Sequence, residues 1–471
     1  MGSCNMYVAI LRDGFLLCAL LAATGAAQAQ STAATAAPAA PADDGLTFHG
    51  ITLYGTVDLG LQYQTHGAPI SDFYPAGSAD IVQKNSNRSV TGITPSNLSQ
   101  SRIGLQGLEP IGGGWSAVFK LETFFNPQSG ELSDGLKSLT QNNGRSVASG
   151  TQNTNLDSSV AGQAFQQSYV GISSKLYGTF TFGRQNTLLA DGIAKYDPNY
   201  ASQAFSLIGL SGTTAGAGDT EDRRLDGSLK YVATYAGIAH FGAMFKPNTG
   251  NGLTDSVFQV NVGGEYAGAS VDAYYVKRND AIAAASLSAA QVALLPGLGY
   301  SSSNSLAGTI SDNTSFSIMA LYSFGAPKIF AGYEHISSAN PTTPLPAGYN
   351  NIGGYVLAFV NNAAFPNNKI LQVYWAGVKY AVTPNIELTA AYYGNKQNSY
   401  GTGGDAGCST PGASTCSGTL DAYSFDAVWR LTKHFDTYAG VMYTGVHGGL
   451  ANGYVFHTTD MNPTTGIRYS F

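Results

Sequence analysis

Apolar and polar residues alternate with a period of two along most of the chain. Over residues 51–64, one set of alternate positions includes Ile51, Val57 and Leu61, and the other set includes Thr52 and Asp58. Successive side chains of a β-strand point to opposite faces, so this pattern predicts a strand with one apolar and one polar face. The same pattern recurs to the C-terminus and predicts about sixteen strands. Their approximate limits are 51–64, 99–109, 115–125, 164–174, 178–187, 224–235, 238–247, 257–267, 269–279, 313–325, 327–338, 369–381, 385–397, 419–432, 435–447 and 464–471.

The connections between these segments alternate in length. Connections such as 174–178, 325–327 and 432–434 are short, whereas those between the resulting hairpins are long. Strands of about ten residues with short turns at one rim and long loops at the other are typical of a transmembrane β-barrel. We therefore expect an all-β barrel whose apolar face meets lipid and whose polar face lines an interior. The long connections are 65–98, 126–163, 188–223, 280–312, 339–368, 398–418 and 448–463.

One long connection contains a helical pattern. Residues 280–295 are rich in Ala and Leu, and they are followed by Pro296 and Gly297. A polar start at Asn279 or Asp280 and a Pro-Gly stop predict a helix of about 15 residues. A helix that crosses a membrane needs about 20 residues. We therefore expect this helix within the loop, where it either packs on its neighbours or partly covers the barrel mouth.

The composition narrows the class of protein. Charged residues make up 11% of the chain, against about 25% in an ordinary soluble domain. The 58 glycines argue against a coiled coil, the aromatic share of 11% against a disordered chain, and the net charge of −6 against a nucleic-acid partner. The sequence also lacks paired metal-binding histidines, a nucleophile elbow and a P-loop. We therefore expect no metal, no cofactor and no enzyme activity.

The N-terminus has the features of an export signal. Residues 14–27 are apolar, and Ala27 and Ala29 form the small-residue pattern that precedes signal-peptidase cleavage. The apolar segment has about 14 residues, fewer than the roughly 20 that span a bilayer, although a short N-terminal anchor is the alternative. We expect a signal peptide over residues 1–29, a flexible Ala/Pro-rich tail over 30–48 and the barrel over 49–471.

Export changes the interpretation of the cysteines. Cys4 and Cys18 lie in the expected signal peptide, which leaves Cys408 and Cys416 in a stretch rich in Gly, Ser, Thr and Pro. An oxidising compartment favours a disulfide between them that closes a local loop. A metal site would need further ligands, and no His lies nearby.

Five segments spread over the chain carry a family resemblance. They are ITLYGTVDLGLQY (51–63), SRIGLQGLE (101–109), GGWSAVFKLE (113–122), QSYVGISSKLYGTFTFGRQ (167–185) and TGIRYSF (465–471). These segments resemble the general diffusion porins of Gram-negative outer membranes, in particular the large β-proteobacterial group. The resemblance implies a sixteen-stranded antiparallel barrel that forms a homotrimer among outer-membrane lipid and lipopolysaccharide. It also implies that the third long loop, residues 188–223, folds into the lumen and narrows it.

The resemblance also implies roles for charged residues. The inward loop of a porin carries acids, and the facing wall presents a row of arginines. Opposed charges of this kind create a transverse field across a narrow aqueous gap, although ordinary solvated charges are the alternative. The Pro-Glu-Phe-Gly turn found in many such loops is absent here. The expected constriction and pore-lining residues are Asp58, Arg102, Lys120, Asp191, Asp197, Asp219, Glu221, Asp222 and Arg224.

Two further roles follow from the resemblance. Arg184 has the parity of outward-facing phenylalanines, and an Arg that faces lipid costs about 2–4 kcal/mol near the midplane. In related porins an Arg at this place contacts the second long loop of a neighbouring subunit. We therefore expect Arg184 at a trimer interface, with an Arg that snorkels to the headgroups as the alternative. The C-terminal residues Ile467, Tyr469 and Phe471 resemble the signal read by the barrel-assembly machinery.

The leading functional hypothesis is a passive outer-membrane channel for ions and small hydrophilic solutes. One alternative is a structural or adhesion barrel whose long loops bind surface partners. The other is a substrate-specific channel with a saturable site. The inferred inward charges of the wall balance in sign, and the acids of the third loop give a weak expectation of cation preference.

Overall fold

The computed structural model describes residues 46–67, 72–73, 87–145, 156–157, 164–208, 223–249, 254–403, 415–451 and 456–471. These residues belong to one compact unit, residues 33–471. The expected signal peptide and most of the expected tail lie outside the described residues. So do four of the expected site residues, namely Asp219, Glu221, Asp222 and Cys408.

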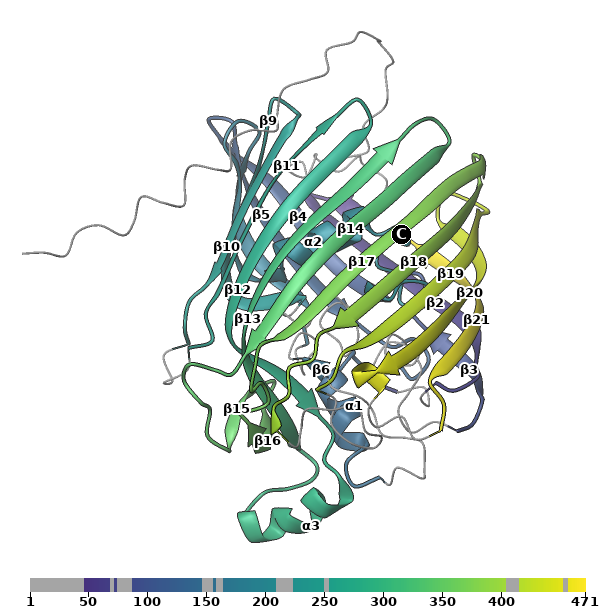
Figure 1. The fold of residues 1–471 in the computed structure, drawn as a ribbon. Coiled ribbons are helices and arrows are strands. Elements are labelled where there is room, and N and C mark those ends of the chain that lie inside the picture. The colour runs from purple at the N-terminus through teal and green to yellow at the C-terminus, as the bar shows by residue number, and fades with distance from the viewer. Residues whose placement is uncertain are drawn as a thin grey trace, which may run out of the picture. The chain divides into compact units, whose positions relative to one another are not determined.

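Sixteen long strands in the described part of the chain close into an antiparallel barrel (Figure 1). The last strand pairs with the first, with Asp58 opposite Arg468. The expected fold is confirmed, and most observed strands match the expected segments within a few residues. The strands are β2 (Ile51–Gln64), β4 (Arg102–Gly112), β5 (Trp115–Phe124), β7 (Gln167–Ser174), β8 (Gly178–Asn186), β9 (Arg224–Tyr235), β10 (Ala239–Lys246), β11 (Val257–Tyr266), β12 (Ala269–Ala285), β13 (Ser305–Ser323), β14 (Pro327–Ala339), β17 (Lys369–Thr383), β18 (Ile386–Gln397), β19 (Gly418–Arg430), β20 (Phe435–Gly448) and β21 (Thr459–Ser470).

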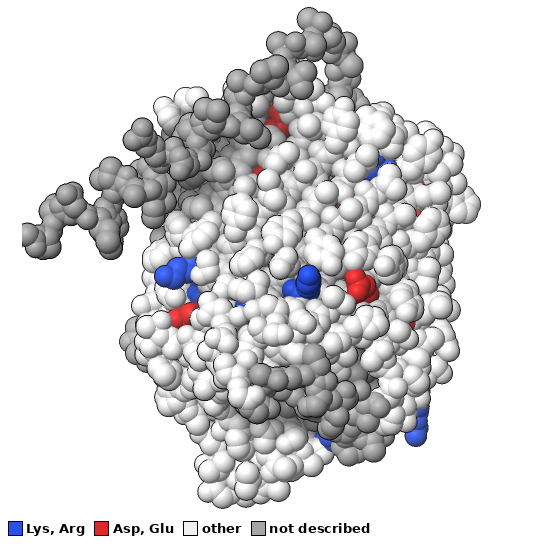
Figure 2. All heavy atoms as spheres, viewed as in Figure 1, with Lys and Arg blue, Asp and Glu red and all other residues white. Residues whose placement is uncertain are grey.

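The period-two pattern sorts side chains to the two faces of the wall. In β2, Val57, Leu61 and Tyr63 are exposed on the outside, whereas Asp58 and Gln62 are buried on the inside. The face of the barrel shown in Figure 2 carries only scattered charged side chains. An outer surface of this kind suits contact with lipid. Other outward residues that are about half exposed are Val170, Phe182, Phe258, Phe316 and Phe425.

The C-terminal residue takes part in closing the barrel. Phe471 and Gly55 exchange two backbone hydrogen bonds of 3.0 Å, which continue the pairing of β21 with β2. A Cβ atom at position 55 would lie 2.4 Å from the Phe471 ring, so glycine leaves room for that ring. Ile467 and Tyr469 point outward and are about half exposed. Their role as an assembly signal stays a prediction.

The wall beside β2 contains an interruption. The short strand β3 (Val90–Pro95) pairs with the C-terminal half of β2, and β4 pairs with its N-terminal half. Residues 96–101 between β3 and β4 belong to neither strand, and Ser96, Asn97 and Ser101 are buried. We call residues 96–101 the inward turn. This strand lies within the expected long connection 65–98, where no strand was predicted.

The remaining described elements are short. One helix, α2 (Leu188–Tyr196), belongs to the third long loop. None of the helices in the described residues combines the length and the apolar character that crossing a bilayer requires. The others are β1 (Thr47–Phe48), α1 (Gly135–Gln141), β6 (Leu156–Asp157), α3 (Ala289–Leu298), β15 (Tyr349–Ile352), β16 (Tyr355–Asn361) and the 3₁₀ turn η6 (Gly449–Ala451).

Three long loops pack together at one end of the barrel, where Figure 1 shows α1, α3, β15 and β16. Leu136 and Leu139 of α1 pack with Ile282 of β12, Leu306 of β13 and Leu357 of β16. β16 also pairs in parallel with β13. The long loops therefore have an apolar core of their own.

The helix expected at 280–295 is displaced. Residues 281–285 continue β12 and pair with residues 307–311 of β13. The helix α3 starts only after Ser288, which forms a capping box with Gln291, and it ends at Gly299 with Pro296 inside its last turn. Strand pairing with β13 overrides the helical preference of the alanines, because tertiary contacts outweigh small differences in propensity.

Candidate functional site

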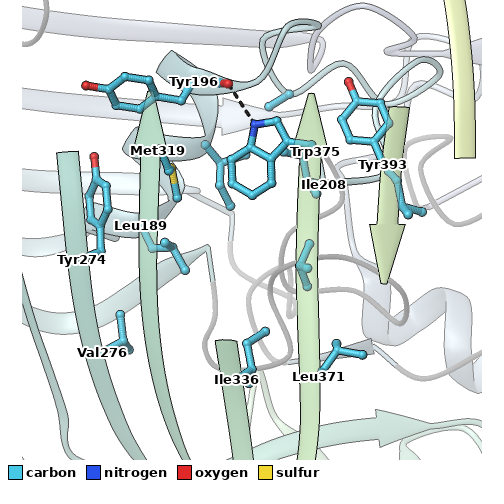
Figure 3. Packing of buried hydrophobic residues seen from close by; sticks show 14 of the residues in the cluster. Leu189, Tyr196, Ile208, Tyr274, Val276, Met319, Ile336, Leu371, Trp375 and Tyr393 are labelled. Carbon is cyan, nitrogen blue, oxygen red and sulfur yellow. Dashed lines mark hydrogen bonds between the residues drawn. The ribbon is translucent and has the colours of Figure 1, made fainter. Parts of the chain in front are cut away.

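The helix α2 is the first part of the third long loop and lies inside the barrel. Thr187 caps the helix by accepting a hydrogen bond from the backbone N–H of Ala190. The helix buries Leu189, Ile193 and Tyr196 against inward-facing apolar residues of the wall (Figure 3). The loop therefore docks on one side of the lumen, which we call the docking wall. Its residues include Val276 of β12, Met319 of β13, Ile336 of β14, Leu371, Val373 and Trp375 of β17, and Tyr393 of β18.

Hydrogen bonds fix the loop on the docking wall. The indole N–H of Trp375 donates to the backbone oxygen of Tyr196 at 3.0 Å, as Figure 3 shows. The Tyr196 hydroxyl binds Ser270 and Asp272 of β12. Burial and the hydrogen bond to Asp272 raise the pKa of this hydroxyl well above its ordinary value, so the group keeps its proton and acts as a donor.

Asp197 follows α2 and has no exposed surface, which corrects the expectation that it faces the aqueous gap. Its carboxylate accepts hydrogen bonds from the backbone N–H groups of Asn199 (3.1 Å) and Ala201 (2.8 Å). It also accepts one from the Tyr393 hydroxyl at 2.7 Å. Burial raises the pKa of the Asp197 carboxyl above its ordinary value. The residue therefore holds a turn of the loop against β18.

Asp58 is the second expected pore-lining acid that has no exposed surface. Parity predicts its inward direction correctly, but the inward turn covers it. The carboxylate accepts hydrogen bonds from the backbone N–H groups of Leu98 (2.8 Å) and Ser99 (3.0 Å) and from the Tyr438 hydroxyl (2.5 Å). These donors occupy it, so Asp58 holds backbone in place and does not face water.

The wall formed by β4 and β5 carries charged residues. It contributes no residue to the apolar cluster between the third loop and the docking wall. Glu122, which is 1% exposed, lies 3.8 Å from Nε of Arg102 and 3.5 Å from Nζ of Lys120. The Tyr54 hydroxyl (2.9 Å) and the Gln167 amide (2.8 Å) also donate to this carboxylate. The side chains of Arg102 and Lys120 remain 38% and 20% exposed. Two partly solvated cations therefore share one buried carboxylate, and we call this region the charged wall.

Two other expected residues lie beside the charged wall. Arg224 at the start of β9 is buried, and its guanidinium lies over the Phe124 ring, 4.6 Å from the centroid. Asp191 of α2 pairs with Lys230 of β9 and accepts a hydrogen bond from Asn186 at 3.1 Å. The Asp191 side chain keeps 31% of its area exposed. Within the described part of the loop, Asp191 is thus a partly solvated carboxylate near β9.

Arg184 lies opposite a bulge in β9. Gly183 pairs with Ser228 and Gln185 with Leu225, so two residues of β9 stand opposite Arg184. Arg184 forms an ion pair with Asp226 of β9 and donates to Gln166 at 3.3 Å. The Arg184 side chain is 9% exposed, whereas that of Asp226 is 58% exposed. The carboxylate that was expected from a neighbouring subunit is therefore present within the chain.

Cys416 is buried and disulfide-bonded. Its expected partner, Cys408, lies outside the described residues. The pairing of these two cysteines therefore stays a prediction.

A family profile described as Gram-negative porin matches residues 17–448. The chain belongs to the Gram-negative porin family. The match covers nearly the whole barrel and agrees with the closed antiparallel wall. Porins of this family are outer-membrane proteins, so the apolar outer face of the barrel meets the lipid of the outer membrane.

Two named outer-membrane porins have similar sequences. An outer membrane porin protein of Bordetella pertussis is 27% identical over 253 residues, which cover 53% of this porin and 52% of that protein. Outer membrane porin protein 32 of Delftia acidovorans is 24% identical over 322 residues, which cover 68% of each chain. The first alignment thus spans about half the length of its relative.

Solved porin structures share the fold. The anion-selective porin from Comamonas acidovorans superposes with a TM-score of 0.55 at 16% identity, covering 89% of this porin and 99% of that chain. The trimer form of OmpT from Vibrio cholerae superposes with a TM-score of 0.53 at 14% identity, with coverage of 89% and 99%. At these identities the likeness concerns the fold.

Several residues of the porin's lumen escape the sequence analysis. Trp375 and Val373 dock the loop, and Asn97 and Tyr438 contact its far end. A signal for the docking wall was present, because the segment 369–383 has apolar residues at both parities. A strand that faces lipid on one side needs a reason to be apolar on the other side, and an inserted loop supplies it. No comparable sequence signal marks Asn97.

Proposed function

We propose that this porin is a passive, water-filled channel for ions and small hydrophilic solutes, with no catalytic step. The observation that carries the proposal is the solvation of charges that point into the barrel. The side chains of Arg102, Asp191 and Arg468 keep 38%, 31% and 25% of their area exposed. A barrel filled by its own side chains would bury them or replace them with apolar residues. Family membership supports the same function.

We infer that the narrow part of the channel prefers anions. Arg102 and Lys120 share the single carboxylate of Glu122, so the charged wall has an excess of positive charge. The weak expectation of cation preference rested on the acids of the third loop. Of the described ones, Asp197 is buried and Asp191 is paired with Lys230. A surplus of positive charge beside a narrow aqueous gap attracts small anions and repels cations.

We propose that the porin is a homotrimer with Arg184 in the subunit contact. The supporting observation is the ion pair between Arg184 and Asp226 on an outer face that is otherwise mainly apolar. An exposed charge costs about 2–4 kcal/mol in lipid near the midplane, and a subunit contact removes that cost. Lipid and lipopolysaccharide would cover the rest of the outer face. The barrel-assembly machinery would read the C-terminal residues Ile467, Tyr469 and Phe471.

Swelling of proteoliposomes tests the channel proposal. Folded porin in vesicles is diluted into isotonic solutions of sugars of increasing size, with heat-unfolded porin as the control. A diffusion channel gives rates that fall with solute size and rise in proportion to concentration. A rate that saturates with one solute favours a substrate-specific channel. A folded porin that admits no solute contradicts the proposal and favours a structural or adhesion barrel.

A further inference from the structure

We propose that Asp58 and Tyr438 are positioning residues that hold the far end of the third loop and thereby fix the width of the channel. The proposal rests on the channel function proposed above. The carboxylate of Asp58, the inward turn 96–101 and the Tyr438 side chain of β20 together form what we call the tip anchor. The loop segment that they hold, residues 202–205, is called the loop tip.

The loop tip is bonded to the backbone of the inward turn. The carbonyl oxygen of Asn97 accepts hydrogen bonds from the backbone N–H groups of Gln203 (2.9 Å) and Ala204 (3.0 Å). It also accepts one from the Ser202 hydroxyl at 2.8 Å. Asn97 has no exposed surface. Three donors on one buried carbonyl therefore fix the loop tip to the barrel beside β2.

Asp58 in turn holds the inward turn, residues 96–101. Residues 96–101 lie between β3 and β4, so the strand ladder does not hold all of their backbone groups. Asp58 accepts the N–H groups of Leu98 and Ser99, and its own backbone carbonyl accepts the N–H of Ser96 at 2.8 Å. Ser96 has a φ of +61°, a conformation that a residue other than glycine adopts at a cost. The bonds to Asp58 offset that cost.

Tyr438 joins this carboxylate to the loop. Its hydroxyl donates to Asp58 and accepts a hydrogen bond of 3.0 Å from the Asn97 side chain. Its ring meets the Phe205 ring edge-on, with centroids 6.3 Å apart and an interplanar angle of 82°. Both rings are almost wholly buried. A Tyr438→Phe variant would therefore keep the ring contact and remove only the hydrogen bonds.

The same arrangement occurs a few residues earlier in the loop. Asp197 also accepts two backbone N–H groups of a turn, those of Asn199 and Ala201, and the hydroxyl of a wall tyrosine, Tyr393. In both places a fully buried carboxylate accepts at least three hydrogen bonds and fixes irregular backbone. Hydrogen bonds to a carboxylate are stronger than those between neutral groups, so each arrangement is a stiff support. The loop is therefore held at two successive points.

The barrel also contains a matched pair that does not touch the loop. The Tyr392 hydroxyl of β18 donates to Asp421 of β19 at 2.7 Å. Asp421 has the parity of Tyr423 and Phe425, whose side chains are about half exposed on the outer face. Tyr392→Phe therefore removes the same kind of bond from the same barrel and serves as a control.

Hydrogen exchange followed by mass spectrometry, on folded porin in detergent micelles, tests the tip anchor. Loss of the Tyr438 hydroxyl should raise the exchange rate of peptides that cover residues 199–208 by about tenfold, which corresponds to the loss of about one hydrogen bond. The barrel strands should keep their wild-type rates. Tyr392→Phe should leave residues 199–208 unchanged. Ser202→Ala removes a donor from the loop side and should reproduce the effect if the Tyr438 variant fails to fold.

Single-channel recording of the same variants links the anchor to the channel. A freed loop tip should give a noisier open-channel current and closure at a lower voltage in Tyr438→Phe and Ser202→Ala. Wild-type exchange rates at residues 199–208 in both variants would overturn the anchor. So would wild-type current traces in variants whose loop exchanges faster. A wild-type porin that conducts no ions would instead overturn the channel function, and the exchange data would still report on the anchor.

Discussion

The docking wall and the charged wall are built on one barrel by the same period-two rule, yet their inward residues differ. On the docking wall, Met319, Val373 and Trp375 point inward and are buried under the third loop. On the charged wall, Arg102 and Lys120 point inward and remain partly solvated. The outward face is apolar in both regions. The type of the inward residue therefore decides where the loop lies and where water remains.

The difference also separates two uses of charge. Asp58 and Asp197 are buried and accept hydrogen bonds from backbone and tyrosine donors. Arg102 and Lys120 keep contact with solvent and can act on a passing ion. One set of charged groups thus positions the loop, and another set remains in contact with solvent.

Loss of the Trp375 side chain should produce the largest effect. Trp375→Ala removes the hydrogen bond to Tyr196 and a buried aromatic ring, at a cost of about 3–5 kcal/mol to loop docking. The loop should leave the docking wall and move into the open gap, so brief closures should become frequent and the mean single-channel conductance should fall. Trp429→Ala removes a half-exposed indole from another strand and should leave the conductance unchanged. Equal conductance in the wild type and Trp375→Ala would contradict the docking wall.

Removal of the two cations should change ion preference. The double variant Arg102→Gln, Lys120→Gln removes the positive neighbours of Glu122 on β4 and β5, so the charged wall loses its positive surplus. The reversal potential in a KCl gradient should shift toward that of K⁺. As a control, Lys379→Gln removes a buried lysine that pairs with the partly exposed Glu387. This variant should shift the reversal potential much less. A larger shift in the Lys379 variant than in the double variant would contradict the assignment of ion preference to the charged wall.

The ion pair between Arg184 and Asp226 offers a test on the outer face. Arg184→Ala removes the cation of this pair. If this pair lies in a subunit contact, its loss should destabilise the trimer by about 2 kcal/mol per contact. Thermal dissociation followed by gel electrophoresis without boiling measures the effect. An unchanged dissociation temperature would remove Arg184 from the subunit interface.

The smallest effect concerns pH on the docking wall. Burial raises the pKa of Asp197 in the docked loop, whereas a detached loop would return the carboxyl to an ordinary pKa of about 4. The docked loop thus binds the proton more tightly. This contribution to docking is complete below the ordinary pKa and is lost as pH rises through the raised pKa. Brief closures should therefore become more frequent as pH rises through this range.

Asp197→Asn isolates that carboxyl from its neighbours. Asp426 of β19 and Glu387 of β18 lie close enough to interact with the same region, together with Lys379. The Asn variant keeps these groups and removes only the titration of Asp197. Recordings at a series of pH values should show a weaker pH dependence in Asp197→Asn. An identical dependence in both proteins would assign the titration to another group.

The barrel itself could be predicted because one face of each strand contacts lipid while the other faces the lumen. That requirement imposes a period-two pattern on segments such as 51–64 and 464–471. The inward direction of Arg102 and Lys120 followed from the same parity. The helix near residue 289 was misplaced because the pairing of β12 with β13 depends on contacts far apart in sequence.

The burial of Asp58 and Asp197 could not be predicted from parity. Parity gives the direction of a side chain but does not say what covers it. Asp58 is covered by the inward turn, which replaces a continuous second strand, and Asp197 by the packing of the loop on β18. Both covers depend on irregular backbone, which leaves no periodic signal. In the sequence, a docked loop was indicated by the apolar residues at inward positions of the segment 369–383.

Single-channel recording of the purified wild-type porin in a planar bilayer tests most directly whether the third loop leaves a water-filled gap beside the charged wall. We expect stable open channels that close in three equal steps at high voltage, with a reversal potential in a KCl gradient displaced toward that of Cl⁻. A folded barrel that conducts nothing would contradict this expectation.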